Sequence, residues 1–176
     1  VPVLDVINAG ARTAVNVTRA RYVGVIGTPA TVNSNAYARA IHGYDSEIRI
    51  FSQACPLFVP LVEEGWLDHA VTRLTAQEYL KPVLCHPIDT LVLGCTHYPL
   101  LKPLLQDVVG SGIQLVDSAE AMAEQTAVVL HGQNLENPAR TSPEYRFFVT
   151  DVPLRFQSIG ERFLGRTLSN VRVIKW

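Results

Sequence analysis

Apolar residues in this chain occur in short continuous runs that alternate with longer stretches in which they recur every three or four positions. Continuous runs are typical of strands buried on both faces, and the longer spacing is typical of helices with one apolar side. The predicted strands span residues 3–7, 22–26, 48–51, 89–93, 113–116, 146–149 and 171–174. The predicted helices span residues 9–20, 30–41, a segment after Pro56, 67–80, 100–109, 119–130 and 154–164. Gly43 and Pro82 are expected to mark the ends of two of these helices.

Buried strands that are each followed by a helix indicate a parallel sheet with helices on both faces, so the predicted fold class is α/β. Ligands in such sheets collect at the carboxyl ends of the strands, because helix N-termini and loop amides point there. Three predicted strand ends carry polar or reactive side chains. They read GTPAT at residues 27–31, QACP at 53–56 and GCTH at 94–97.

The composition narrows the class of function. Hydrophobic residues make up 48% of the 176 positions and charged residues 18%, which suits a globular fold with a sizeable core. The net charge of −1 supplies no basic field for nucleic acid, so a small-molecule ligand is expected instead. No apolar run is long enough to span a bilayer, and the N-terminus has no basic segment followed by an apolar one. We therefore expect a cytoplasmic protein with no nucleic-acid or membrane partner.

Three cysteines are present, which is an odd number for a disulfide framework. Cys55 precedes Pro56 at a strand end and is expected to be structural. Cys85 falls in a proline-flanked loop and is expected to have no role. Cys95 follows a buried strand and precedes a helix, where a helix N-terminus favours thiolate, and this position suits a nucleophile or a proton carrier.

Two neighbours of Cys95 add chemistry to the same turn. Thr96 brings a hydroxyl group and an amide, and His97 brings an imidazole that can set the protonation state of a nearby thiol. On spacing alone, a structural interpretation is favoured, in which Cys95 is a small buried hydrophobe and His97 a hydrogen-bonded residue at a helix start.

The wider sequence shifts this balance. Residues 93–101 read LGCTHYPLL and resemble the second cysteine motif of the glutamate racemases in the aspartate/glutamate racemase superfamily. Four more segments match the family in the same order. They are GVIGTPATVNSNAY at 24–37, ACPLFVPLVEEG at 54–65, VDSAEA at 116–121 and FFVTD at 147–151.

The resemblance implies a cofactor-independent racemase that interconverts L- and D-glutamate and supplies the D-isomer for peptidoglycan. Inverting a stereocentre by proton transfer needs one group on each face of the α-carbon, and the family uses two cysteines. Cys95 would be the second of these, with His97 holding or acidifying its thiol. Glu63 matches a family carboxylate near the active site, and a solvated helix residue is an equally weighted alternative. Thr28, Thr31, Thr96 and His97 correspond to positions that contact substrate.

The sequence departs from the family pattern at its start. Family members begin with an Asp-Ser motif near a glycine-rich turn, followed by a Tyr-Gly pair and an Ala-Cys-Asn-Thr motif, and this arrangement does not occur here. An N-terminal portion is therefore expected to be missing, and the chain alone is expected not to racemise glutamate. The family has two pseudo-symmetric, doubly wound parallel-sheet domains. Residues 8–116 would form one nearly complete domain that carries the second cysteine, and residues 1–7 and 117–176 the rest of the other. The strands at 146–149 and 171–174 would then lack sheet neighbours and expose apolar edges.

Several alternatives remain open. Cys85, His86, Cys95 and His97 are of suitable type for zinc, but the two pairs flank a buried strand and so lie toward opposite ends of a sheet, and we expect neither a metal nor a cofactor. An aspartate racemase, a hydantoin racemase or a maleate isomerase would also keep two cysteines. A non-catalytic remnant that binds an acidic ligand is a third class. A homodimer is one arrangement open to the protein.

Overall fold

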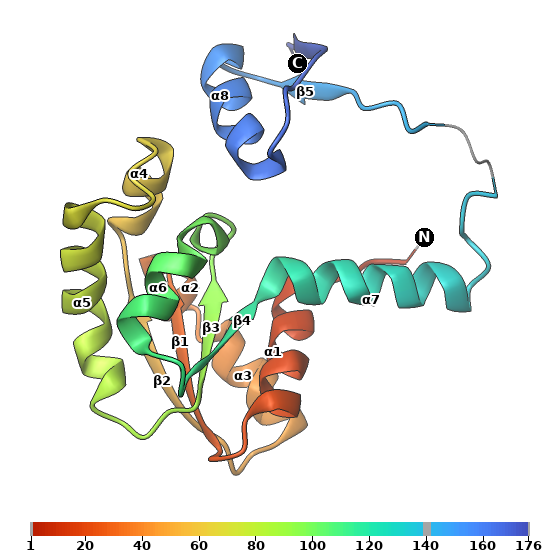
Figure 1. Ribbon diagram of the computed structural model, residues 1–176. Helices are drawn as coiled ribbons and strands as arrows, with labels where there is room; N and C mark the ends of the chain where they lie inside the picture. Colours follow the sequence, from red (N-terminus) through yellow and green to blue (C-terminus); the bar gives the residue numbers. More distant parts are fainter. Residues whose placement is uncertain (1, 139–141, 176) are drawn as a thin grey trace. The chain divides into compact units, whose positions relative to one another are not determined.

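The structure is a computed structural model that describes residues 2–138 and 142–175 (Figure 1). It divides into two compact units, Val1–Leu135 and Glu136–Trp176. The first unit contains α1 (Val6–Val17), β1 (Tyr22–Gly27), α2 (Pro29–Asn33), α3 (Ala36–Tyr44), β2 (Arg49–Ala54), α4 (Phe58–Glu63), α5 (Ala70–Leu84), β3 (Thr90–Gly94), the 3-10 helix η1 (Tyr98–Leu101), α6 (Lys102–Val109), β4 (Gln114–Asp117) and α7 (Ser118–Gly132).

The four strands of the first unit form one parallel sheet in the order β2-β1-β3-β4. The chain moves from β1 to β2 on one side and then crosses back to β3 on the other side of β1. The order of the strands therefore reverses between β1 and β3, which defines a topological switch point. This doubly wound sheet confirms the predicted α/β class.

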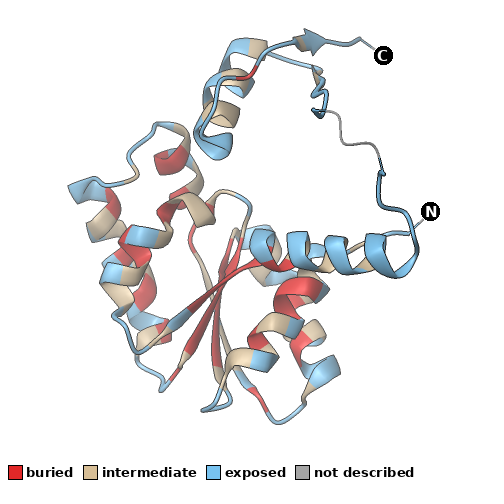
Figure 2. Cartoon of the chain, turned by 45° about the vertical axis from the view of Figure 1, so that its right-hand side comes forward, coloured by how far each residue is buried: buried red, intermediate tan, exposed pale blue. Residues whose placement is uncertain are grey.

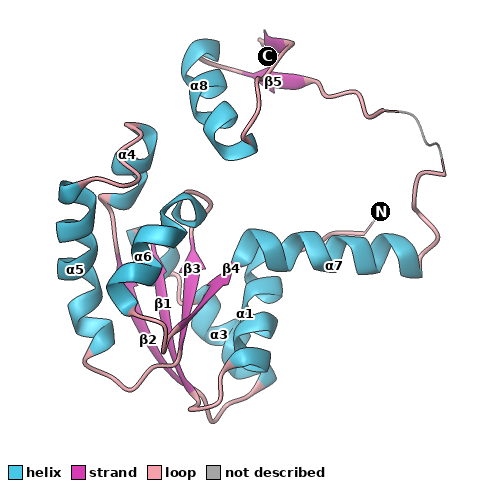
Figure 3. Ribbon diagram, viewed as in Figure 1, coloured by secondary structure: helices cyan, strands magenta, loops and turns pink. Residues whose placement is uncertain are grey.

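Both faces of the sheet are covered by helices (Figure 3). On one face, Ile26, Leu91 and Leu93 pack with side chains from α4, α5, η1 and α6. On the other face, Val23, Val25 and Val92 pack with side chains from α1 and α3. All five residues of β3 are buried, and buried residues concentrate in the strands (Figure 2). Burial on both faces explains the continuous apolar character of this strand.

Two predictions near the N-terminus are wrong. Residues 3–5 form no strand, and α1 begins at Val6 because the side chain of Asp5 accepts a hydrogen bond from the backbone N–H of Ile7 at 2.9 Å, which caps the helix. The predicted helix 30–41 is two helices, α2 and α3. They are separated at Asn35, whose φ of 52° lies in the left-handed region and interrupts the helix.

Two predicted helix ends are also wrong. Gly43 lies inside α3, and Asp45 takes the C-cap position after Tyr44. Pro82 lies inside α5, which continues to Leu84. Pro82 lacks only its own backbone N–H, and the last turn still closes because the backbone N–H of Cys85 donates to the carbonyl of Lys81 at 3.1 Å. The other predicted elements are present with shifted ends.

The second unit contains β5 (Phe147–Val149), α8 (Pro153–Leu164) and β6 (Val171–Val173). The prediction that these strands lack sheet neighbours is wrong, because β5 and β6 pair with each other in parallel. Leu168 is buried against α8, where Gly160 leaves room: a Cβ atom at Gly160 would lie 2.6 Å from Leu168 Cδ1. Phe148 and Val173 are about half exposed, at 53% and 49%.

The boundary between the compact units falls after Leu135 rather than after residue 116, because α7 packs against α1 in the first unit. Residues 1, 139–141 and 176, which the domain prediction includes, lie outside the described residues. The assignment of 8–116 and of 1–7 with 117–176 to two domains of a longer protein stays a prediction. Within the described ranges, no helix is both long and apolar enough to cross a membrane.

Candidate active site

The switch point between β1 and β3 brings two of the predicted polar strand ends together. Gly27 and Gly94 are register partners at the carboxyl ends of the two strands. Thr28 follows β1 directly, and Cys95 follows β3 directly. The third polar strand end, at Gln53 and Ala54, belongs to β2 on the other side of β1. The fold thus places Thr28 and Cys95 at the position where open α/β sheets bind their ligands.

Two threonines line this position from the β1 side. Thr28 is the N-cap of α2, and its hydroxyl accepts a hydrogen bond from the backbone N–H of Thr31 at 3.3 Å. The two hydroxyl oxygens are 3.1 Å apart. Their side chains are only partly buried, so the pair can offer hydroxyl donors and acceptors to a polar ligand.

The Cys95 side chain is partly buried, and burial raises the pKa of its thiol above the ordinary value. The backbone N–H groups of His97 and Tyr98 donate hydrogen bonds to the thiol and oppose this increase without cancelling it. The prediction that the helix N-terminus makes thiolate the favoured form is therefore wrong: the turn after Cys95 leads into the short 3-10 helix η1, and desolvation outweighs its amides. At neutral pH the thiol is protonated, which suits a proton donor.

His97 and Glu63 come together next to this turn. The imidazole Nε2 lies 3.5 Å from Glu63 Oε1, and both side chains are about one quarter exposed. The other ring nitrogen, Nδ1, lies 3.4 Å from the Thr96 hydroxyl. Contacts at both ring nitrogens fix the orientation of the imidazole. Glu63 therefore contacts a residue of the Cys95 turn, and its role in the site stays a prediction.

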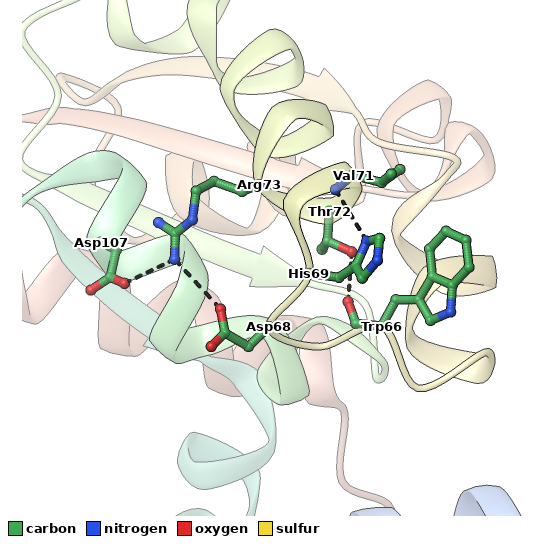
Figure 4. Close-up of polar contacts among 7 residues, drawn as sticks. All are labelled: Trp66, Asp68, His69, Val71, Thr72, Arg73 and Asp107. Carbon is green, nitrogen blue, oxygen red and sulfur yellow. Dashed lines mark hydrogen bonds and ion pairs between the residues drawn. The ribbon is translucent and has the colours of Figure 1, made fainter.

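The loop between α4 and α5 holds the end of the helix that carries Glu63. Gly65 adopts a φ of 79°, and the backbone N–H of Trp66 donates to the carbonyl of Leu61 at 2.9 Å, which closes the C-terminal turn of α4. The fully buried Thr72 donates its hydroxyl to the Trp66 carbonyl at 2.5 Å (Figure 4). The Trp66 ring stacks on His69, which caps α5.

An ion-pair cluster lies beside this loop. Arg73 contacts Asp107 at 3.3 Å and Asp68 at 3.6 Å (Figure 4). The bond to Asp107 ties α5 to α6 across the surface of the first unit. Nothing in the sequence pattern indicated this loop or its anchors. The one hint in the sequence was that the segment 54–65, which resembles the family, ends in VEEG just before this loop.

The other two cysteines differ from Cys95 in burial and position. Cys55 is fully buried, and burial raises the pKa of its thiol to about 12. Its carbonyl accepts a hydrogen bond from the hydroxyl of Tyr98 at 2.8 Å. Cys85 is exposed and precedes β3, whereas Cys95 follows it. Among the residues that the structure describes, no three His, Cys, Asp or Glu side chains gather closely enough to hold a metal ion.

The comparisons with known proteins agree with this geometry. Residues 1–126 match the model of the Asp/Glu/Hydantoin racemase family, and the chain belongs to that family. Among curated relatives, it is 73% identical to a glutamate racemase of Syntrophus aciditrophicus over 99% of this chain and 65% of that protein. It is 58% identical to a glutamate racemase of Neisseria meningitidis over 98% of this chain and 64% of that protein.

The fold is similar to solved glutamate racemases. The Bacillus anthracis enzyme superposes with a TM-score of 0.93 at 36% identity, over 99% of this chain and 65% of that one. The Francisella tularensis enzyme, solved in complex with D-glutamate, superposes with a TM-score of 0.90 at 40% identity. The match covers 99% of this chain and 64% of that one. The resemblance predicted from the motifs is confirmed. The chain spans about two thirds of the length of these relatives, at 63–65%.

Proposed function

We propose that this chain carries one half of the catalytic site of a glutamate racemase, which interconverts L- and D-glutamate by proton transfer at the α-carbon without a cofactor. The observation that carries the proposal is the register of β1 and β3, which starts the Thr28 turn and the Cys95 turn side by side at the switch point of the sheet. Relatives that match nearly the whole chain bear the name glutamate racemase, and one was solved with D-glutamate. Both findings support the same substrate class.

Each side chain has a role in this scheme. Cys95 exchanges a proton with the α-carbon from one face, and its protonated thiol is the form that delivers a proton. The hydroxyls of Thr28, Thr31 and Thr96 bind the substrate carboxylates. His97, held by Glu63, stabilises negative charge as it develops beside Cys95.

Racemisation requires a second acid-base group on the opposite face of the α-carbon. Cys55 is a poor candidate because it is fully buried with a pKa of about 12. Cys85 lies before β3, at the amino end of the strand that carries Cys95 at its carboxyl end. We assign the second group to a thiol outside these 176 residues, in the other domain of a longer protein. The short chain is then inactive by itself. D-Glutamate made in this way would serve peptidoglycan synthesis in the cytoplasm.

The test is racemisation followed by circular dichroism with L-glutamate and, separately, L-aspartate. Two proteins are compared: the 176-residue chain, and a chimera that adds the part of the Syntrophus aciditrophicus relative that the chain does not match. We expect the chimera to racemise L-glutamate but not L-aspartate, and the 176-residue chain to racemise neither. Preference for aspartate, or a folded chimera with no turnover, would refute the proposed activity. Turnover by the short chain would refute the assignment of the second base.

A further inference from the structure

A buried hydrogen-bond chain lies directly behind the Cys95 turn. The hydroxyl of Tyr37, on α3, lies 2.9 Å from the hydroxyl of Ser118, the first residue of α7. The Ser118 hydroxyl donates to the backbone carbonyl of Leu93, in β3, at 3.3 Å. Tyr37 and Ser118 are 4% and 6% exposed. These two hydrogen bonds join α3, α7 and β3 at Leu93, which lies two residues before Cys95.

The number of hydroxyl protons determines which group donates in each of these hydrogen bonds. A serine hydroxyl has a single proton, and here Ser118 gives it to Leu93. Tyr37 must then be the donor to Ser118, so the relay runs from the phenol to the serine hydroxyl to the strand carbonyl. Loss of the serine hydroxyl would leave a buried phenol without an acceptor, which costs more than loss of the phenol hydroxyl itself.

Two glycines shape the space around this pair. A Cβ atom at Gly94 would lie 2.9 Å from Tyr37 Cε2, so the tyrosine ring packs on the bare backbone of the residue before Cys95. A Cβ atom at Gly10, on α1, would lie 2.8 Å from the Ser118 hydroxyl. Both distances are shorter than real Cβ contacts allow. The helices α1, α3 and α7 therefore converge on the end of β3 through these contacts.

We propose that Tyr37 and Ser118 are positioning residues that hold the Leu93–Gly94–Cys95 turn, and so fix where the Cys95 thiol lies relative to Thr28 and Thr31. The importance of that position for turnover rests on the proposed function. The anchoring of the turn does not rest on that function, because the reactivity of the Cys95 thiol can be measured without any substrate. Neither residue touches the reacting atoms, so both act through Cys95.

The experiment measures alkylation of Cys95 and Cys55 by iodoacetamide in the 176-residue chain, with a Cys85→Ser change to remove the exposed thiol. Mass spectrometry follows each cysteine separately. Cys55 is fully buried and serves as an internal reference, because global opening of the fold exposes it as well. The variants are Tyr37→Phe, Ser118→Ala and the double variant. Tyr79→Phe is the control, since it removes a phenol hydroxyl from α5, where the partly buried Tyr79 packs against the core on the opposite face of the sheet.

Anchoring predicts a selective effect. Loss of one buried hydrogen bond shifts a local opening equilibrium by about fivefold. Ser118→Ala removes two such bonds, so it should accelerate alkylation of Cys95 by at least about that factor while Cys55 stays unchanged. Tyr37→Phe should have a smaller effect. Added to Ser118→Ala it should lessen the acceleration, because it removes the phenol hydroxyl that has lost its acceptor. Tyr79→Phe should leave Cys95 unchanged. Equal acceleration of both cysteines, additive effects of the two changes, or no acceleration of Cys95 would each overturn the proposal. If the chimera with the Syntrophus aciditrophicus segment were inactive, the proposed racemase activity would be refuted. The alkylation result would still decide whether Tyr37 and Ser118 anchor the Cys95 turn.

Discussion

Gly27 and Gly94 are partners in the parallel register of β1 and β3, so the Thr28 turn and the Cys95 turn start side by side. Their missing side chains matter. A Cβ atom at Gly27 would lie 3.1 Å from Thr31 Cβ and 3.4 Å from the Gly94 carbonyl oxygen. The close approach of the two strand ends to α2 and to each other depends on this glycine pair.

Gly94→Ala should destabilise the first unit. The new methyl group would lie 2.9 Å from the Ile26 carbonyl oxygen and 2.9 Å from Tyr37 Cε2. Overpacking of this kind costs about 1–3 kcal/mol in the free energy of unfolding, which urea denaturation can measure. Gly43→Ala is the control, because its methyl group meets no atom within 4 Å and lies inside α3, and it should stabilise by about 0.5–1 kcal/mol. Equal effects of the two changes would contradict this packing.

Asp89 makes stability depend on acid pH. Burial disfavours its charged form, but hydrogen bonds from Thr18, from the backbone N–H groups of Ala20 and Arg19, and from Thr90 outweigh burial and lower its pKa. Because the folded pKa is below the unfolded value near 3.8, the stabilisation is complete above that value and is lost as pH falls through the folded pKa. The melting temperature should therefore fall on acidification below about pH 4. The fall should be shallower in Asp89→Asn, and an unchanged slope would count against this role.

Thr72→Val should loosen the loop that follows Glu63. The change keeps the shape of the side chain but leaves the Trp66 carbonyl without the buried hydroxyl that donates to it. The expected cost is about 1–3 kcal/mol in unfolding free energy, measured by chemical denaturation. Thr72→Ser keeps the hydroxyl and should lose less stability. The assignment fails if the serine variant is the less stable of the two.

The three thiols should differ in reactivity. Cys85 is exposed, Cys95 is half-buried with a raised pKa, and Cys55 is fully buried with a pKa of about 12. Alkylation near pH 8 should modify Cys85 first, Cys95 next and Cys55 last, because the thiolate is the reacting form and must be accessible. Mass spectrometry at timed intervals gives the order. Early labelling of Cys55 would show that the core around it is open.

The sequence predicted the class of fold and the family well. Continuous apolar runs revealed the four strands of the main sheet, since strands buried on both faces cannot alternate with polar residues. The motif around Cys95 indicated the family correctly. Glu63 lies 3.5 Å from His97, and its part in the site stays a prediction. These features depend on local residue types that a single sequence displays.

Other features depend on cooperation between distant segments. Asn35 splits one helix into two through a left-handed backbone, which periodicity does not reveal. The pKa of Cys95 is set by burial, which outweighs the helix amides that the sequence suggested. The contact between Tyr37 and Ser118 joins residues 81 positions apart. Both lie in segments that match the family, but only the folded chain shows that they meet.

The most direct test of the account replaces Cys95 by serine in the active chimera, which keeps the size of the side chain but not its acidity. Racemisation of L-glutamate is followed by circular dichroism, with an unchanged far-ultraviolet spectrum as the control for folding. The account predicts a loss of about 10²–10⁴-fold in turnover, the usual contribution of a positioned acid-base group. A folded Cys95→Ser chimera that racemises glutamate at the original rate would contradict it.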